Sequence, residues 1–356
     1  MKLREKLRQF DKVRRQKLVW IEKLFYKAIS LNRKPEKTSI DKKEIKKILI
    51  VRNNKRIGNV LFLIPFVDQT IKIYPDAKID LILMEPWQGQ FFDGFKINKI
   101  LYSKLRMSGI LNFTKTIRAA NKENYDLILC PFGSSTDTII SGLISSRNKV
   151  SSYDNTRSRI FPNSNQYDEK FTHTAYKPLS ILEAMGNKLR FPIKHHITLS
   201  SDEKIKGIVD ANRLKVNINE LNVAFFRGAR GKKRLSDATW NNILDRIESV
   251  SKVKINWIEI LSKDLDYPLR QSNCRTFYSE DMRHLGSVLR HLDGFVCCDT
   301  GPLHLADAVG ATCIGLFTET NIDDFGTLGS NSINIQGLEK LDEKTVFEKL
   351  YNWQTI

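Results

Sequence analysis

The chain has 356 residues, of which 41% are hydrophobic, so it is long enough for two ordinary domains and is neither a tail nor a peptide. Its 58 Lys and Arg residues outnumber its 40 Asp and Glu residues, which gives a net charge of +18. Residues 1–47 alone hold 17 of these cations against six anions, so most of the excess lies in one terminal arm. Nucleic-acid binders usually spread their cations over the folded domain, and this distribution argues against nucleic acid as a partner.

The cysteines and the length of the apolar runs indicate the cellular compartment of the protein. The five cysteines form no CxxC pair, and most lie in or beside apolar runs, so we expect reduced thiols, a cytoplasmic protein and no structural zinc. The longest apolar runs, such as residues 81–84, fall far short of the roughly 20 residues of a membrane-spanning helix. The basic N-terminus lacks the apolar stretch of a secretory signal.

The N-terminal arm, residues 1–31, predicts an amphipathic helix, because apolar residues recur along it at helical spacing with Lys and Arg between them. Two interpretations stay open. The helix lies on anionic lipid, with Trp20, Phe25 and Tyr26 near the interface, or it packs on its own core or on a second subunit. The polar residues after it predict a linker, so residues 1–47 form one segment, a basic arm and linker.

Residues 48–170 alternate short apolar runs with helical patterns, which predicts a parallel sheet covered by helices. We expect strands at 48–51, 79–84, 99–102, 126–130 and 149–153, and helices at 60–74, 108–121 and 137–146.

Residues 171–340 predict a linker followed by a second domain of the same kind. We expect helices at 174–185, 237–250, 281–291 and 302–308, and strands at 222–226, 254–261, 275–278, 294–298 and 312–317. Residues 341–356 predict a last helix that returns toward the N-terminal domain. The fold class is therefore α/β, with two doubly wound, Rossmann-like domains facing a cleft, where ligands of such folds bind.

The sharpest candidate site is the decapeptide at residues 297–306, Cys-Cys-Asp-Thr-Gly-Pro-Leu-His-Leu-Ala. A buried strand runs into a turn, and Pro302 suits the first turn of the following helix. The free backbone N–H groups of such a helix start form a phosphate site, and Asp299 would accept a hydrogen bond from a sugar hydroxyl. The alternative is structural: Asp299 and Thr300 cap the helix and His304 packs in the core.

In each domain, a cationic loop follows the first strand. The loop at residues 227–234 has two glycines and the cations Arg227, Arg230, Lys232 and Lys233, which suit a diphosphate leaving group. Its alternative is an ordinary solvated loop. The loop at residues 52–60 contains Gly58, which permits a close backbone approach, and Asn59, which begins the next helix facing the cleft.

These motifs resemble the heptosyltransferases of glycosyltransferase family 9. The resemblance covers about residues 47–340 and rests on residues 51–61, Pro65, and residues 74–80, 173–176, 182–186, 228–230 with Lys233, and 299–304. It implies a GT-B fold, ADP-heptose as donor, the inner core of lipopolysaccharide or lipooligosaccharide as acceptor, and inversion at the anomeric carbon without a metal. The ADP-sugar is a substrate, and no cofactor is implied.

Carried over by position, the resemblance also implies roles for single residues. Thr300, Gly301 and His304, with Pro302 between them, would contact the donor phosphates. Asp299 would contact the donor sugar or the adenosine ribose, and Lys233 with Arg230 the diphosphate.

One position departs from the family. The family usually has Asp after the glycine of its first motif, as the proposed base, whereas this chain has Asn59, whose amide cannot accept a proton. Losing a base costs about 10²- to 10⁴-fold in rate. Three explanations stay open. Glu85, at the end of the second strand, serves as an alternative base; orientation and leaving-group stabilisation suffice; or the chain binds without catalysing.

Two other patterns carry less weight. The Asp264-Leu265-Asp266 triplet has the form by which GT-A transferases hold a divalent ion, but the alternation on both sides does not suit that fold. His195 and His196 have no partner ligands at metal-binding spacing, and we expect a structural role for both.

The sequence thus predicts a cytoplasmic glycosyltransferase, peripheral on the inner face of the inner membrane, that moves heptose from ADP-heptose to a lipopolysaccharide core. The acceptor is expected at Gly58 and at the cations Arg52, Lys55, Arg56, Arg157 and Arg159. The alternatives are a weakened or non-catalytic relative that binds a nucleotide or a glycan, and the same fold with a different nucleotide sugar. The number of subunits stays open.

Overall fold

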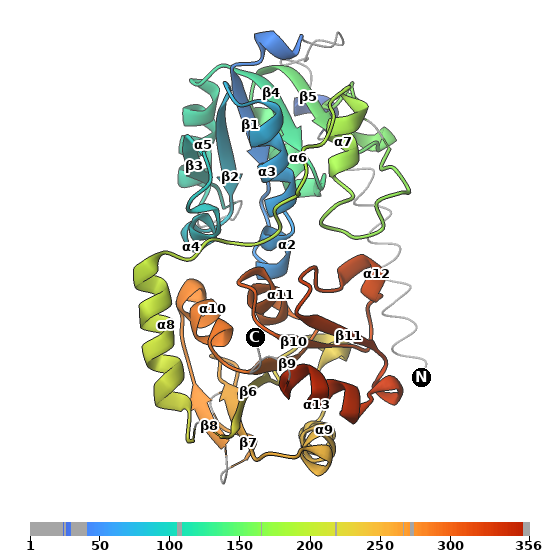
Figure 1. Ribbon diagram of the computed structural model, residues 1–356. Helices are drawn as coiled ribbons and strands as arrows, with labels where there is room; N and C mark the ends of the chain where they lie inside the picture. Colours follow the sequence, from blue (N-terminus) through green and yellow to red (C-terminus); the bar gives the residue numbers. More distant parts are fainter. Residues whose placement is uncertain are drawn as a thin grey trace.

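The computed structural model describes residues 24, 26–29, 41–104, 109–164, 166–217, 219–265, 267–270 and 274–351. Within these ranges the chain forms two α/β domains, one above the other in Figure 1. The N-terminal sheet has five strands in the order β3-β2-β1-β4-β5, and the C-terminal sheet has six in the order β11-β10-β9-β6-β7-β8. All pairs of neighbouring strands in these sheets are parallel, so the predicted pair of doubly wound domains is confirmed.

The elements of the N-terminal domain follow the predicted alternation. The strands are β1 (Lys47–Val51), β2 (Lys78–Leu83), β3 (Lys99–Tyr102), β4 (Tyr125–Cys130) and β5 (Ser146–Ser151). The helices are α2 (Ile57–Leu61), α3 (Ile64–Ile73), α4 (Pro86–Gly89), α5 (Ile110–Asn121) and α6 (Ser135–Leu143). The helix predicted at 60–74 is in fact two helices, because Pro65 has no N–H for the carbonyl of Leu61 and fits only the first turn of a new helix.

The connection between the domains holds two helices, α7 (Leu179–Ala184) and α8 (Ser201–Leu214). The helix predicted at 174–185 is shorter than expected, because it begins only after Pro178. Helix α8 was not predicted, although Ser200 and Glu203 form a capping box at its start.

The C-terminal domain contains one strand that was not predicted, β11, at the edge of its sheet. Its strands are β6 (Leu221–Phe226), β7 (Ile255–Ile260), β8 (Cys274–Phe277), β9 (Gly294–Cys298), β10 (Cys313–Phe317) and β11 (Ser332–Gln336). Its helices are α9 (Asp237–Val250), α10 (Met282–Arg290), α11 (Gly301–Ala308), α12 (Ile322–Phe325) and α13 (Glu343–Tyr351). Short 3-10 turns lie at Lys42–Glu44, Gln90–Phe92, Asn155–Arg157, Gly231–Lys233 and Leu338–Lys340.

The last helix, α13, corrects a prediction. We expected it to return toward the N-terminal domain, but its described part packs on α9 and β6 of its own domain. Val346, Phe347 and Leu350 form its buried stripe and join the apolar cluster that includes Trp240. This stripe at helical spacing is buried inside the C-terminal domain.

The end of the N-terminal arm packs on the protein itself. Tyr26 is only 3% exposed and lies in a small apolar cluster with Cys130, Ile160 and Phe161. Ile29 lies against Gly142 of α6. At these residues the interpretation of a helix on its own core is confirmed, while residues 1–23, which include Trp20, and Phe25 fall outside the described residues.

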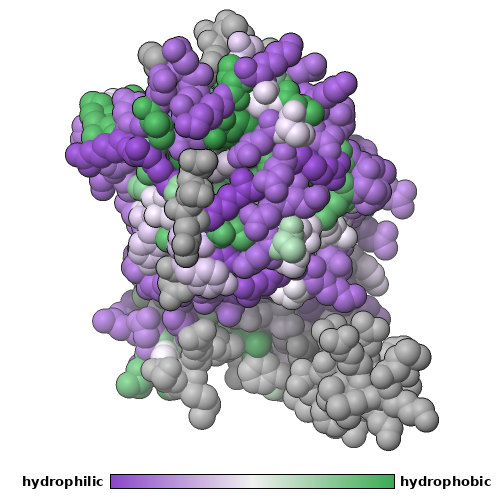
Figure 2. All heavy atoms as spheres, turned by 90° about the horizontal axis from the view of Figure 1, so that it is seen from below, coloured by the Kyte–Doolittle hydropathy of each residue, from purple (hydrophilic) through white to green (hydrophobic). Residues whose placement is uncertain are grey.

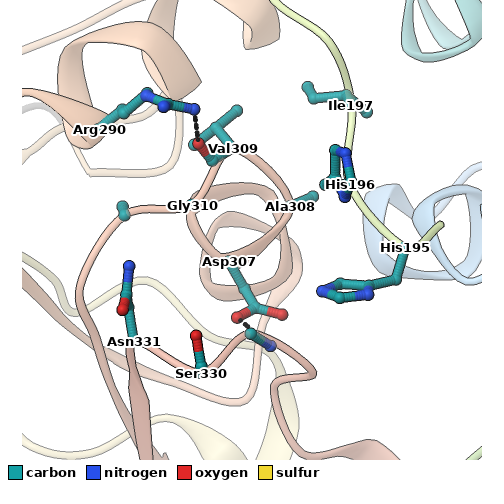
Figure 3. Close-up of a pocket in the computed structure, with 12 residues that line it drawn as sticks. His195, His196, Ile197, Arg290, Asp307, Ala308, Val309, Gly310, Ser330 and Asn331 are labelled. Carbon is teal, nitrogen blue, oxygen red and sulfur yellow. Dashed lines mark hydrogen bonds between the residues drawn. The ribbon is translucent and has the colours of Figure 1, made fainter. Parts of the chain in front are cut away.

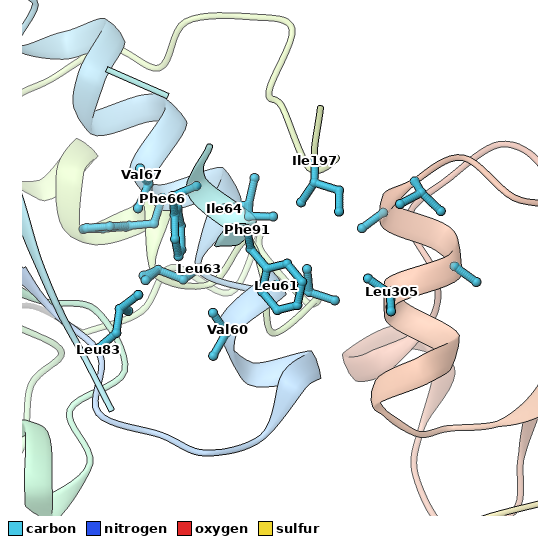
Figure 4. Close-up of a cluster of buried hydrophobic side chains, with 14 of the residues drawn as sticks. Val60, Leu61, Leu63, Ile64, Phe66, Val67, Leu83, Phe91, Ile197 and Leu305 are labelled. Carbon is cyan, nitrogen blue, oxygen red and sulfur yellow. The ribbon is translucent and has the colours of Figure 1, made fainter. Parts of the chain in front are cut away.

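The two domains touch directly through α2 and α11. Figure 4 shows Leu61 and Ile197 facing Leu305 of α11, and the buried apolar cluster that contains these three residues extends into both domains. The carboxyl ends of the two sheets therefore meet at a packed contact, and this contact brings the predicted motifs of the two domains together.

Candidate active site

The start of α11 lies at the carboxyl end of β9, where the sequence predicts an anion site. The chain leaves β9 at Cys298, and the helix begins at Gly301 after Thr300. The side chain of Thr300 does not cap the helix, because its Oγ1 lies 3.1 Å from Cys297 Sγ. The N–H groups of the first helical turn have no acceptor within the helix, so they remain suited to an anion.

Asp299 is the centre of a polar cluster at this helix start. One carboxylate oxygen lies 3.0 Å from His304 Nε2, and the other accepts hydrogen bonds from Lys233 and from Thr320, whose Oγ1 is 2.6 Å away. The ammonium of Lys233 also lies 3.3 Å from the backbone carbonyl of Asp299. The structure thus brings together Asp299, Lys233 and His304 as predicted, and it adds Thr320, which sequence analysis missed.

The charge of Asp299 is set by these contacts. The side chain is only 6% exposed, and burial alone would raise its pKa. The hydrogen bonds from His304, Lys233 and Thr320 outweigh that effect and hold the pKa of Asp299 well below its ordinary value. The site therefore presents an ionised carboxylate beside a lysine and a helix start.

The N-terminal domain meets this cluster at Gly58. A Cβ at Gly58 would lie 2.9 Å from His304 Cδ2, and a Cβ at Gly301 would lie 2.9 Å from Ile57 Cβ. The ring of Phe62 packs edge-on to His304, with centroids 4.7 Å apart. The close backbone approach expected at Gly58 is thus to helix α11 of the C-terminal domain.

Asn59 is the next residue along α2 and is half-buried. Its backbone carbonyl lies 3.5 Å from Arg52 Nε, and its side chain makes no hydrogen bond to the described part of the chain. Asn59 therefore lies one residue from the contact with His304, and its amide has no hydrogen-bond partner in the described part of the chain.

Three of the predicted ligand-binding arginines are buried and already occupied. Arg227 donates to Glu259 at 2.5 Å and pairs with Asp237 at 3.0 Å, and Arg52 pairs with Asp137 at 3.4 Å.

Arg157 donates to the carbonyl of Gly133 and pairs with Asp154 at 3.2 Å. Arg227, Arg52 and Arg157 are each at most 8% exposed, and their contacts hold the surrounding loops in place. The expected contacts of these three arginines with substrate stay a prediction.

The remaining cations of both loops are accessible. Lys55, Arg56 and Arg159 on the N-terminal side, and Arg230 and Lys232 on the C-terminal side, are exposed. These five side chains, together with Lys233 and the exposed Arg234, are positive groups around the two loops that an anionic substrate can reach.

Glu85 lies at the predicted edge of the N-terminal sheet, but it has a partner. Its carboxylate pairs with Lys104 at 2.5 Å. Helix α4, which Glu85 precedes, is joined to the loop after β1 by a hydrogen bond from Gln88 to the carbonyl of Asn54. Glu85 is therefore near this loop, with one oxygen of its carboxylate paired to Lys104.

The motif at residues 173–176 anchors the linker to the C-terminal domain. His173 Nδ1 accepts from the N–H of Ala175 at 3.1 Å, so its Nε2 carries the proton and donates to the carbonyl of Gly326 at 2.9 Å. Burial lowers the pKa of His173, which favours this neutral form. Lys177 adds an ion pair to Asp324 of α12 at 2.6 Å.

A cavity of about 210 Å³ lies at the opposite end of α11 (Figure 3). His195 and His196 of the linker lie on one side of it, and Asp307 of α11 on the other. The carboxylate of Asp307 is occupied by the N–H groups of Leu328 and Gly329, at 2.8 and 3.0 Å, and by Ser332. A second cavity, of about 580 Å³, lies beside Tyr74 in the N-terminal domain.

Neither cavity includes the Asp299 cluster. Within the described ranges, no group of three or more His, Cys, Asp or Glu side chains could hold a metal ion. Asp266 of the Asp264-Leu265-Asp266 triplet lies outside the described residues. Among the helices that the structure describes, none has the length and apolarity to cross a membrane.

Comparisons with known proteins agree with the fold. The structure superposes on a glycosyltransferase family 9 protein from Veillonella parvula with a TM-score of 0.70 and 14% identity, covering 89% of this chain and 93% of that one. It superposes on the ADP-heptose lipopolysaccharide heptosyltransferase II of E. coli with a TM-score of 0.67 and 14% identity, covering 87% and 100%.

A third match is the E. coli heptosyltransferase WaaC with ADP, at a TM-score of 0.63 and 14% identity, covering 84% and 97%. At this identity the likeness shows the fold. The doubly wound pair of domains therefore excludes the GT-A alternative.

At the level of sequence, a comparison with curated proteins finds no match. The model of glycosyltransferase family 9, described as heptosyltransferase, matches residues 280–352, which contain α10, the Asp299 cluster except Lys233, and the described part of α13. This match and the shared fold confirm the resemblance to glycosyltransferase family 9, the heptosyltransferases.

Proposed function

We propose that this protein transfers heptose from ADP-heptose to a lipopolysaccharide core acceptor, with inversion and without a metal ion, at the inner face of the inner membrane. The observation that carries the proposal is the cluster of Asp299, Lys233 and His304 at the start of α11. Support also comes from the E. coli heptosyltransferase of the same fold, which has been solved with ADP and with ADP-2-deoxy-2-fluoro heptose.

In this proposal the donor diphosphate binds the free N–H groups at the start of α11. The ammonium of Lys233 leaves the carboxylate of Asp299 and binds the phosphates, since it already lies at this helix start. Exposed Arg230 and Lys232 add positive charge as the ADP leaving group gains negative charge. Asp299, once released from Lys233, accepts a hydrogen bond from a donor hydroxyl while His304 and Thr320 hold it.

The acceptor would enter from the N-terminal side, where Lys55, Arg56 and Arg159 are exposed and suit phosphorylated or acidic sugars. Its hydroxyl attacks the anomeric carbon from the face opposite ADP. The amide of Asn59 orients that hydroxyl, and its proton passes to Glu85 or to solvent.

The test is a transfer assay with ADP-heptose and a core acceptor that lacks the heptose. Asp299→Ala and Lys233→Ala should each lower transfer by about 10²-fold or more, because each removes a charged contact to the donor. Lys252→Ala, an exposed lysine before β7, is the matched control and should retain transfer. Circular dichroism checks that each variant is folded. Wild-type turnover in both site variants would overturn the donor-site assignment.

A second candidate function is favoured by one observation, the amide at Asn59 where the family usually has a carboxylate. A chain with this substitution would bind a nucleotide or glycan with weak or no transfer. Asn59→Asp separates the two, since a restored base should raise transfer by about 10²- to 10⁴-fold in a weakened enzyme. Absence of transfer in both forms, with nucleotide binding intact, supports the binding protein. Transfer from another nucleotide sugar alone identifies a changed donor.

A further inference from the structure

Helix α8 has one face on the protein and one face in solvent. It packs on α10 through its buried small residues Gly207 and Ala211, and Ser287 of α10 donates to the carbonyl of Glu203 at 2.7 Å. The opposite face exposes three aliphatic side chains at helical spacing: Ile205 is 60% exposed, Ile208 40% and Val209 43%. In Figure 1 this helix forms the left outer edge of the C-terminal domain.

Cations border this apolar stripe on both sides. Lys204 lies one turn before Ile208 on one side, and Lys206 and Arg213 lie one turn before and after Val209 on the other. Lys204 and Lys206 have no acidic partner among the described residues.

The acidic residues of α8 are mostly turned away from the stripe. Glu203 pairs with the buried Arg283, and Asp210 pairs with Arg213 and His284, which leaves Asp202 as the exposed acid without a partner in the described ranges. In Figure 2, apolar residues stand among hydrophilic ones on the left edge, the side on which α8 lies in Figure 1.

We propose that α8 lies flat on an anionic lipid surface, with Ile205, Ile208 and Val209 among the acyl chains and the bordering cations at the lipid phosphates. An apolar stripe between cations is the pattern of helices that lie in the membrane interface. A stable protein partner needs about 800 Å² on each side, from some 20–30 residues. A stripe of three aliphatic side chains is too small for that, whereas lipid requires only this one face.

This contact would orient both domains, because α8 is joined to the domain boundary. Arg283 of α10 holds Glu203 with two hydrogen bonds, of 2.5 and 2.7 Å, and it also donates to the carbonyl of Gln90 in the N-terminal domain at 2.7 Å. The inference builds on the proposed function by naming α8 as the surface that touches the membrane. It does not depend on which sugar is transferred.

The first test is sedimentation of the full chain with vesicles of phosphatidylcholine, with and without phosphatidylglycerol. The wild type should bind the anionic vesicles, and I205S/I208S/V209S should weaken that binding by about tenfold or more. The matched control is I110S/L111S in α5, whose two side chains are 53% and 83% exposed but lie on the other domain, and it should bind like the wild type. Equal binding of all three proteins would overturn the proposal.

A second measurement keeps the proposal falsifiable if the N-terminal arm also binds lipid. An environment-sensitive dye at Ile205→Cys, on a Cys274→Ser background, should shift to the blue when the protein is on anionic vesicles, while the same dye at Leu111→Cys should not. Bound protein without a shift at position 205 contradicts a lipid contact at α8. Conversion of a dimer to a monomer by I205S/I208S/V209S, with unchanged sedimentation, would assign the face to a second copy and reject lipid. Neither readout requires transfer, so failure here leaves the proposed reaction standing.

Discussion

The loop after β1 and the loop after β6 each begin with an arginine buried at the end of its strand. Arg52 pairs with Asp137 and lies 4.1 Å from the ring centre of Phe132. Arg227 pairs with Glu259 and lies 4.5 Å from the ring centre of Tyr267. In both domains the first cation of the loop is thus fixed between a carboxylate and an aromatic ring.

Beyond this arginine the two loops differ. In the C-terminal domain the loop reaches Lys233, which meets Asp299 at the start of α11. In the N-terminal domain it reaches Gly58 and Asn59, where α2 packs on α11 and the Asn59 amide has no partner in the described part of the chain. One loop therefore supplies charge to the site, while the other supplies contact and an uncharged amide.

The largest expected effect tests the similarity of the two buried arginines. Arg227→Met leaves Glu259 buried without its cation and should lower the free energy of unfolding by about 3–5 kcal/mol, with a comparable loss for Arg52→Met. Arg230→Met, in the same loop but exposed, should change it by less than about 0.5 kcal/mol. Urea unfolding measures all three. If Arg227→Met matched the wild type, its guanidinium would be available to a ligand after all.

A smaller effect tests the difference between the glycines of the two loops. Gly58→Ala places a methyl against His304 and should cost about 1–3 kcal/mol by overpacking the domain contact. Gly231 has a φ of +63° and open space around it, so Gly231→Ala costs only backbone strain, about 1 kcal/mol. Small-angle scattering should show an altered domain arrangement for Gly58→Ala alone. Identical scattering from both variants would mean that the α2–α11 contact does not fix the domains.

The smallest effect concerns acid stability and separates Lys233 from the free cations of the other loop. Because the folded pKa of Asp299 lies below its unfolded value of about 3.9, this carboxylate stabilises the fold above about pH 4. That contribution is lost as the pH falls further, toward the folded pKa. As the pH falls below about 5, the free energy of unfolding should therefore fall less in Lys233→Met than in the wild type. In Lys55→Met it should fall as much as in the wild type. Urea unfolding across this pH range is the measurement, and equal slopes would remove Lys233 from the causes of the shift.

Much of the fold could be predicted from the pattern of apolar residues. The strands at 99–102 and 294–298 and the helix at 237–250 have the predicted bounds, because short apolar runs and helical stripes mark them clearly. Helix α8 escaped prediction because it packs through Gly207 and Ala211 and turns aliphatic residues to solvent, so its pattern lacks the usual apolar core stripe. Strand β11 lies at a sheet edge and has only Ile335 buried, so it has no continuous apolar run.

The candidate site was predictable where its residues lie at strand ends or at the start of a helix. Asp299 and His304 lie on one turn of chain, and Lys233 comes after a strand end, so their meeting at the sheet edge could be expected. The roles of Arg52 and Arg227 could not, because nothing in the sequence marks Asp137 of α6 and Glu259 of β7 as their partners. Thr320 was missed because a single threonine after a strand carries no signal of its own.

The central claim is that the start of α11, with Lys233 and Asp299, binds the diphosphate of a nucleotide sugar. Isothermal titration calorimetry of ADP into the wild type, Lys233→Ala and the control Lys252→Ala tests it most directly. The wild type and the control should bind ADP equally, and Lys233→Ala should bind it about tenfold or more weakly, as expected for one lost charged hydrogen bond. Equal affinity of all three proteins for ADP would contradict the claim.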